Sequence, residues 1–375
     1  MKKYLLLTLL FLSFRLVAQA QPTQGELCSY YGTDDKEIYN FNHHFDFYWD
    51  ASGTSACYAM SVADLLTEDK YLRLIGTVSN QEATNKISVI DIQRCDMEAG
   101  HGLGYPNFAE LSAFSMECAL YKEGACLEKQ AMFNIIMPSN AEALTDKLRY
   151  YKFQEFMNIY DGWKKWKVLG HSDSSYFEAA AGVFWQYLPK TDGYSYQHFK
   201  SSFYLAKNRV HFLNLLLTTD NCAEKRYTFE NRGLFWKNYY KDNYYSFIPF
   251  KKEKMAIIKK AFSLKRSSML ALYLETDNGS SLIHSAVVTA MRMSGGKCQL
   301  YLRSSTEPYA AEYTNGKGWF SNWYDADTIL ESTLSIKYLK EVSAEDYETA
   351  KALFLKKDIN KSYIIDKLYT DPETY

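Results

Sequence analysis

The residues best suited to chemistry in this sequence are one cysteine and one histidine that lie far apart along the chain. Cys57 follows the small, flexible run D-A-S-G-T-S-A, and apolar residues recur every three or four positions after it, which predicts a helix. A thiol in the first turn of a helix is stabilised as a thiolate by unpaired amides and by the helix dipole. His284 lies in the apolar run L-I-H-S-A-V-V, which predicts a strand. Because imidazole is a common base for a thiol nucleophile, we regard Cys57 and His284 as a candidate catalytic pair.

The cysteine count supports a free thiol. The chain has 7 cysteines, so in an oxidising compartment six can pair and one is left over. The alternative is that Cys57 is a buried structural cysteine or a disulfide partner, and that His284 is a hydrogen-bonded core histidine. No C-x-x-C pair occurs, and the adjacent His43 and His44 would point to opposite faces of a strand. We therefore expect no metal site and no cofactor.

The start of the sequence has the parts of a secretory signal peptide. Lys2 and Lys3 precede an apolar run at 4–14, and an A-x-A cleavage signal ends at Ala20. This pattern predicts removal of residues 1–20 and a secreted or periplasmic protein. The alternative is an uncleaved anchor, but the apolar run is short for a membrane span and Arg15 interrupts it. No later segment approaches 18 apolar residues, so we expect no stable membrane insertion after cleavage.

Charge and local patterns indicate the fold class. Lys plus Arg number 43 and Asp plus Glu 44, a balance that argues against a nucleic-acid partner. Helical spacing at 57–66 and 107–121 precedes an aromatic-rich, mostly helical region at 140–265. Strand-like runs at 268–274, 284–292 and 298–303 follow, separated by glycine-containing turns, and the region from 343 on is again helical in pattern. Helices followed by a largely antiparallel sheet are typical of an α+β protein.

Four segments resemble papain-family cysteine peptidases, in the order that the family has them. S-A-C-Y-A-M-S-V-A-D-L-L resembles the active-site helix, and K-I-S-V-I-D-I-Q-R-C followed by G-H-G-L-G-Y-P is similar to the segment downstream of it. L-I-H-S-A-V-V resembles the histidine strand, and G-K-C-Q-L-Y-L-R-S-S resembles the strand after that. The resemblance covers residues 45–125 and 265–340.

The resemblance implies a two-lobed fold and a set of site residues. Residues 21–139 would form the helical lobe, 140–265 a large insertion, 266–342 the β lobe and 343–375 a C-terminal helical extension. Cys57 would be the nucleophile and His284 the base. The family's orienting Asn falls on Ser304, whose hydroxyl can accept from an imidazole N–H. The family's oxyanion-hole Gln falls on Ala51, beside Asp50, so that side-chain donor is missing.

The function that this implies is a secreted cysteine peptidase acting on a peptide or protein substrate through a Cys–His dyad. The replacements at Ala51 and Ser304 leave an alternative open, a pseudopeptidase that binds a peptide or protein partner in the same cleft. An acyltransferase or amidase on the same scaffold is a third option.

Overall fold

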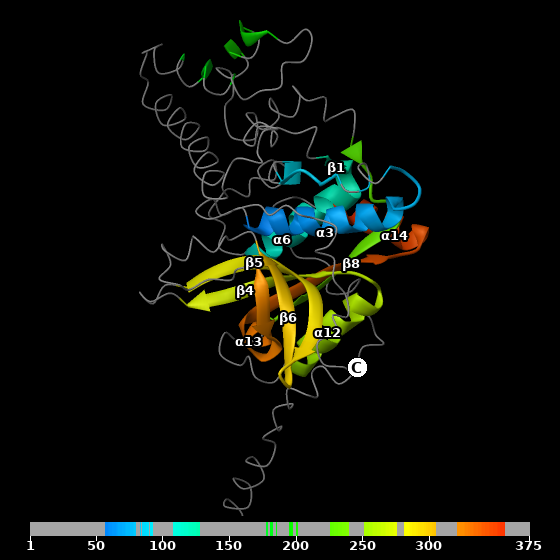
Figure 1. Ribbon diagram of the computed structural model, residues 1–375. Coiled ribbons are helices and arrows are strands. Elements are labelled where there is room, and N and C mark those ends of the chain that lie inside the picture. Colours follow the sequence, from blue (N-terminus) through cyan, green and yellow to red (C-terminus); the bar gives the residue numbers. More distant parts are fainter. Residues whose placement is uncertain are drawn as a thin grey trace, which may run out of the picture.

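The computed structural model describes residues 57–79, 108–127, 226–239, 251–275, 281–304 and 321–356, with residues 83, 85–89, 91–92 and a few positions between 178 and 201. Figure 1 shows these parts as coloured ribbons. The expected signal peptide, and Asp50 and Ala51, lie outside the described residues.

A six-stranded antiparallel sheet forms the centre of the described structure. Its strand order is β3-β8-β4-β5-β6-β7, and every neighbouring pair is antiparallel. The strands are β3 Arg232–Asn238, β4 Ser268–Glu275, β5 Ser281–Ser294, β6 Lys297–Ser304, β7 Asn322–Asp325 and β8 Thr333–Glu341. A separate two-stranded sheet pairs β1 Ala125–Cys126 with β2 Arg226–Tyr227. Together with the helices, this arrangement confirms the predicted α+β class.

Helices lie on both faces of the large sheet (Figure 1). On one face α12 Lys251–Ser263 and α13 Ala326–Ser332 cover the main hydrophobic core, to which β4, β5, β6 and β8 contribute alternate residues. On the other face lie α3 Cys57–Leu74 and α6 Phe108–Cys118, which continues as a short π-helix, η2 Ala119–Glu123. Helix α14 Ala344–Lys356 packs against η2. No described helix combines the length and the apolar character that a membrane crossing requires.

Helix α3 is buried on nearly all sides over residues 57–71, including its charged positions. The pattern predicted one apolar face, and the structure buries the polar face as well. The carboxylate of Glu68 accepts from the backbone N–H and the hydroxyl of Ser267, at 2.9 Å and 2.7 Å. Arg303 Nε lies 2.7 Å from an oxygen of Asp64. Since buried charges are tolerated when they are paired, these contacts explain how a charged helix can lie against the sheet.

Asp69 is the most deeply buried of these acids. Its side chain is fully buried, and its Oδ1 lies 2.8 Å from Arg232 Nε and 2.9 Å from Arg266 Nη2. Arg232 belongs to β3 and Arg266 precedes β4. A single carboxylate of α3 therefore links the helix to two parts of the sheet.

Strand β3 differs from the expectation for the region 140–265. This region was expected to be a mostly helical insertion, but Arg232–Asn238 pairs with β8 along its whole length, from Arg232↔Glu341 to Asn238↔Ser335. The end of the same region supplies α12, which packs on the core. Strand β3 and helix α12 of this region thus belong to the main sheet unit, and residues 202–225 and 240–250 lie outside the described residues.

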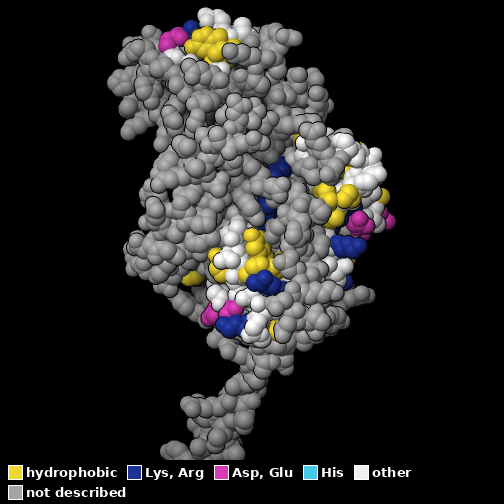
Figure 2. Space-filling model, viewed as in Figure 1, with side chains coloured by type: hydrophobic (Ala, Val, Ile, Leu, Met, Phe, Trp, Pro, Cys, Tyr) yellow, Lys and Arg dark blue, Asp and Glu magenta, His cyan; other side chains and the backbone are white. Residues whose placement is uncertain are grey.

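The edge strand β7 is held by an aromatic and cationic stack. The guanidinium of Arg292 lies 4.1 Å from the ring centre of Trp323, and the Tyr301 ring meets Trp323 edge-on at 5.3 Å. Figure 2 shows hydrophobic and basic side chains close together over this end of the sheet. Such cation–π and edge-to-face contacts stabilise a short strand that has few ladder bonds of its own.

Candidate functional site

The sulfur of Cys57 lies at the start of α3, against strand β5. Cys57 is buried with 8% of its surface exposed, and its thiol is free, whereas Cys118, Cys126 and Cys298 are disulfide-bonded. The backbone N–H groups of Ser285, Tyr58 and Cys57 lie near the sulfur and favour its thiolate form. The first-turn amides thus point at the sulfur, as expected for the N-terminus of a helix.

Burial outweighs these hydrogen bonds in setting the charge of the thiol. Removal from water raises the pKa of Cys57 to about 11, although the hydrogen bonds from Ser285 and Tyr58 act in the opposite direction. A thiolate needs solvation that three amides do not replace in full. At neutral pH Cys57 is therefore a protonated thiol.

His284 is also buried, on β5, one residue before the amide that contacts Cys57. One imidazole nitrogen, Nε2, lies 2.9 Å from the hydroxyl oxygen of Ser304, the last residue of β6. Burial lowers the pKa of His284 to about 4, because the cationic ring cannot be solvated there. At neutral pH the ring is therefore neutral, with one of its nitrogens engaged by Ser304.

The sheet register explains why His284 and Ser304 meet. Ser304 is directly opposite Ala286 in the β5–β6 ladder. Side chains alternate along a strand, so His284 and Ala286 point to the same face. His284 is consequently the diagonal neighbour of Ser304, within reach of a hydrogen bond.

Cys57 and His284 come close through the backbone of β5. The amide that donates to the Cys57 sulfur belongs to Ser285, the residue that follows His284. Among the described residues, Ser304 is the hydrogen-bond partner of the imidazole, and no hydrogen bond joins the sulfur to the ring. The structure thus joins the His284 ring to Ser304 and places the backbone amide that follows His284 at the Cys57 sulfur, with the thiol and the ring both uncharged.

Two further residues at this site had no clear signal in the sequence. Ser321 contacts the backbone of Ser304 through its hydroxyl. Asp64 binds Arg303, the neighbour of Ser304, and so ties the end of β6 to α3. Asp64 lies seven residues after Cys57, two helical turns along the same face, but an acid in a helix normally indicates a solvent-facing position.

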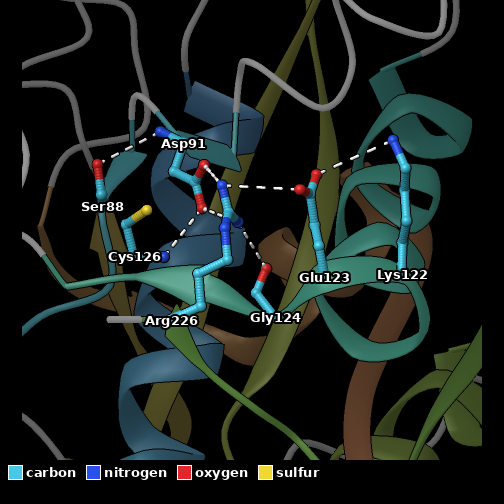
Figure 3. A network of polar contacts seen from close by, with 7 residues as sticks. All are labelled: Ser88, Asp91, Lys122, Glu123, Gly124, Cys126 and Arg226. Carbon is cyan, nitrogen blue, oxygen red and sulfur yellow. Dashed lines mark hydrogen bonds and ion pairs between the residues drawn. The ribbon is translucent and has the colours of Figure 1, made fainter. Parts of the chain in front are cut away.

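A second buried polar cluster, shown in Figure 3, lies around β1 and β2. Arg226 donates from Nη1 and Nη2 to the two oxygens of Asp91, each at 3.1 Å, and the amide of Cys126 donates to Asp91 at 2.9 Å. Arg226 also lies 3.7 Å from Glu123 and donates to the carbonyl of Gly124. Both oxygens of Asp91 are used by the backbone and by Arg226, so the cluster has a structural role in joining these strands.

No site for a metal ion is formed by the described residues, which hold no group of three or more potential ligands. Asp50 and Ala51, expected near the oxyanion, lie outside the described residues. Comparison of the chain with protein-family models, with curated proteins and with solved structures finds no match in any of the three. The function must therefore be argued from the residues of the site itself.

Proposed function

We propose that this chain is a papain-like cysteine hydrolase that cleaves peptide bonds, with Cys57 as nucleophile, His284 as base and Ser304 as the residue that orients the ring. The observation that carries the proposal is the buried contact of Ser304 with Nε2 of His284, at 2.9 Å, beside the strand amide that donates to the Cys57 sulfur. With Nε2 engaged by Ser304, Nδ1 is the nitrogen that takes up a proton. The resemblance of four ordered sequence segments to the papain family supports the same assignment.

The neutral resting state defines how the first step proceeds. His284 takes the thiol proton on Nδ1 while the Cys57 sulfur bonds to the carbonyl carbon, and the carbonyl oxygen gains the negative charge. The C–N bond then breaks, and the imidazolium gives its proton to the leaving amine. Water next attacks the thioester: His284 accepts one proton from it, the C–S bond breaks, and the proton returns to the sulfur.

The oxyanion has few donors in this proposal. The backbone N–H groups of Cys57 and Tyr58 point at the sulfur and are the nearest preorganised donors. The family's side-chain donor is replaced by Ala51. Since one missing oxyanion donor costs roughly 100- to 1,000-fold in turnover, the proposed enzyme is slow compared with a peptidase that has the complete set.

A trapping experiment tests this function. The mature protein is incubated with denatured casein and with fluorogenic peptide amides, quenched in acid and analysed by mass spectrometry. We expect peptide cleavage and an acyl group on Cys57, both lost in Cys57→Ala, and reduced cleavage in Ser304→Ala. Cleavage that persists in a folded Cys57→Ala variant would rule the nucleophile out.

A second function, a pseudopeptidase that binds a peptide or protein partner at the same site, is favoured by one specific observation. The Cys57 thiol is buried and protonated, and it forms no hydrogen bond to His284 within the described residues. A binding protein needs the shape of the site and not the thiol, so Cys57→Ala would bind peptides from an immobilised peptide array as the wild type does. Absence of cleavage together with this unchanged binding would favour the second function.

Residues 1–20 are proposed to be a secretory signal that is removed. The support is the sequence pattern of two lysines, a short apolar run and A-x-A. Sequencing the N-terminus of the protein recovered outside the cytoplasm should give Gln21 first. Recovery of an intact Met1 there would contradict cleavage.

A further inference from the structure

Ser304 ends its strand at the point where the β6–β7 ladder stops. The last paired residues of this ladder are Leu302 and Asn322. Beyond them, the hydroxyl of Ser321 accepts from the N–H of Ser304 at 3.0 Å and donates to its carbonyl oxygen, also at 3.0 Å. A single hydroxyl thus provides both hydrogen bonds that a strand partner would otherwise supply to Ser304.

Arg303, the residue before Ser304, is held by helix α3 on the other face of the sheet. Arg303 donates from Nε to Asp64 on α3 at 2.7 Å, and its side chain is buried. Since Arg303 and Ser304 are adjacent, their side chains point to opposite faces of the sheet. The Arg303 contact therefore holds the strand end against α3, and the Ser321 contact sets the position of the Ser304 backbone.

From this arrangement we propose that Ser321 is a positioning residue of the site. By holding both backbone polar groups of Ser304, it keeps the Ser304 hydroxyl where Nε2 of His284 can donate to it. We assign the ring proton to Nε2, with the Ser304 hydroxyl as its acceptor and the lone pair on Nδ1. The value of this for catalysis rests on the function proposed above, but the effect on the ring is measurable without any substrate.

The experiment measures the tautomer of the His284 ring directly. The full mature chain is labelled with 15N-histidine, and the His284 signals are assigned as those missing in His284→Gln. In the wild type at pH 7 we expect one neutral tautomer with the proton on Nε2. In Ser321→Ala the two hydrogen bonds to Ser304 are lost, and we expect the signals to shift toward a mixture of both tautomers.

Two matched variants separate positioning from general stability. Ser321→Thr retains a hydroxyl and should restore the single tautomer. Ser343→Ala removes a different serine, whose hydroxyl caps the first turn of α14 by accepting from the N–H of Asp346 at 3.1 Å. That variant should lose stability without changing the His284 signals. If turnover is measurable, Ser321→Ala should lower kcat by roughly 10- to 100-fold with little change in KM.

The outcomes distinguish this inference from the proposed function. Unchanged His284 signals in Ser321→Ala, with altered signals in Ser304→Ala, would overturn the role of Ser321 and leave the proposed function standing. Shifted signals without any cleavage by the wild type would support the role of Ser321 while the proposed hydrolase fails. Should Ser321→Ala not fold, Ser321→Cys is used in its place, because a thiol of similar size is a weak hydrogen-bonding group.

Discussion

At the scale of single residues, the thiol of Cys57 is subject to two opposing effects. The amides at the start of α3 and on β5 favour the thiolate, and burial disfavours it. Burial is the larger effect, and it also keeps His284 neutral. A helix N-terminus therefore does not make a cysteine reactive unless water or a cation also reaches it.

The pH dependence of alkylation follows from the pKa of Cys57. Because this pKa is raised to about 11, labelling by iodoacetamide should increase about tenfold for each pH unit up to pH 10, with no fast phase at pH 5 to 6. Labelling is followed by mass spectrometry in the wild type and in His284→Ala. A fast phase at pH 5 to 6 that disappears in His284→Ala would instead reveal a thiolate–imidazolium pair.

The stability of the fold should fall as the pH drops below the ordinary pKa of histidine. His284 has its pKa lowered from 6.5 to about 4 in the folded state, so between these values the unfolded chain binds more protons and acid favours unfolding. The effect is on the order of 3 kcal/mol across this window. Urea unfolding at pH 7, 5.5 and 4.5 should show a smaller loss in His284→Gln. Parallel losses in both proteins would contradict the neutral, buried ring.

At the scale of elements, the position of α3 depends on its acidic residues more than on an apolar stripe. Asp64, Glu68 and Asp69 each contact a different part of the sheet unit, through Arg303, Ser267 and the pair Arg232 and Arg266. Hydrophobic contacts have little directional preference, whereas these charge-assisted hydrogen bonds fix the rotation of the helix and its position along the strands. The nucleophile is held at β5 by this arrangement.

Asp69→Ala should be strongly destabilising. It leaves Arg266 without its carboxylate and Arg232 with only the exposed Glu341, and breaking a buried ion pair in this way typically costs about 3–5 kcal/mol. A matched control is Lys297→Ala, which removes an exposed pair with Asp325 at the same distance of 2.9 Å as the Asp69–Arg266 contact. The control should change the free energy of unfolding by less than about 1 kcal/mol. Equal effects of the two substitutions in urea unfolding would show that Asp69 does not anchor the helix.

At the scale of the whole molecule, the described helix α3 and the sheet form one interdependent unit. The partners of the α3 acids lie on β3, before β4 and on β6. Detachment of α3 would separate its acids from their arginine and serine partners in the sheet unit. Opening of the helix alone is therefore unfavourable.

Unfolding should therefore expose Cys57 and disrupt the sheet in the same transition. Pulsed alkylation of Cys57 and far-UV circular dichroism, measured over one urea titration, should give the same midpoint. Ser343→Ala serves as a control, since weakening α14 should shift both midpoints equally. Labelling of Cys57 at a lower urea concentration than the loss of ellipticity would mean that α3 detaches first.

The sequence predicted the local elements of this unit well. The strands expected at 268–274, 284–292 and 298–303 coincide with β4, β5 and β6, because alternating apolar residues and glycine turns are local signals. Strand β3 was missed because its partner β8 is remote in sequence and its residues lie in an aromatic-rich region of helical spacing. Pairing between distant segments leaves no trace in a local pattern.

The sequence indicated candidate residues for the site but not their charge states. Cys57, His284 and Ser304 were selected by position and resemblance; in the structure His284 is hydrogen-bonded to Ser304, and the amide after His284 lies at the Cys57 sulfur. Their protonation depends on how completely they are buried, which three-dimensional packing decides. Ser321 was missed because its hydroxyl contacts the Ser304 backbone at the point where the β6–β7 ladder stops. The sequence does not show where that ladder ends.

The contact between Cys57 and β5 has a consequence for biosynthesis. A nascent chain leaves the ribosome from its N-terminus, so α3 emerges long before the amide of Ser285 is available to cover the sulfur. During this interval the unpaired thiol competes with the other cysteines of the chain for partners. In the oxidising compartment that the proposed signal peptide implies, wrong disulfides can therefore form until β5 covers the sulfur.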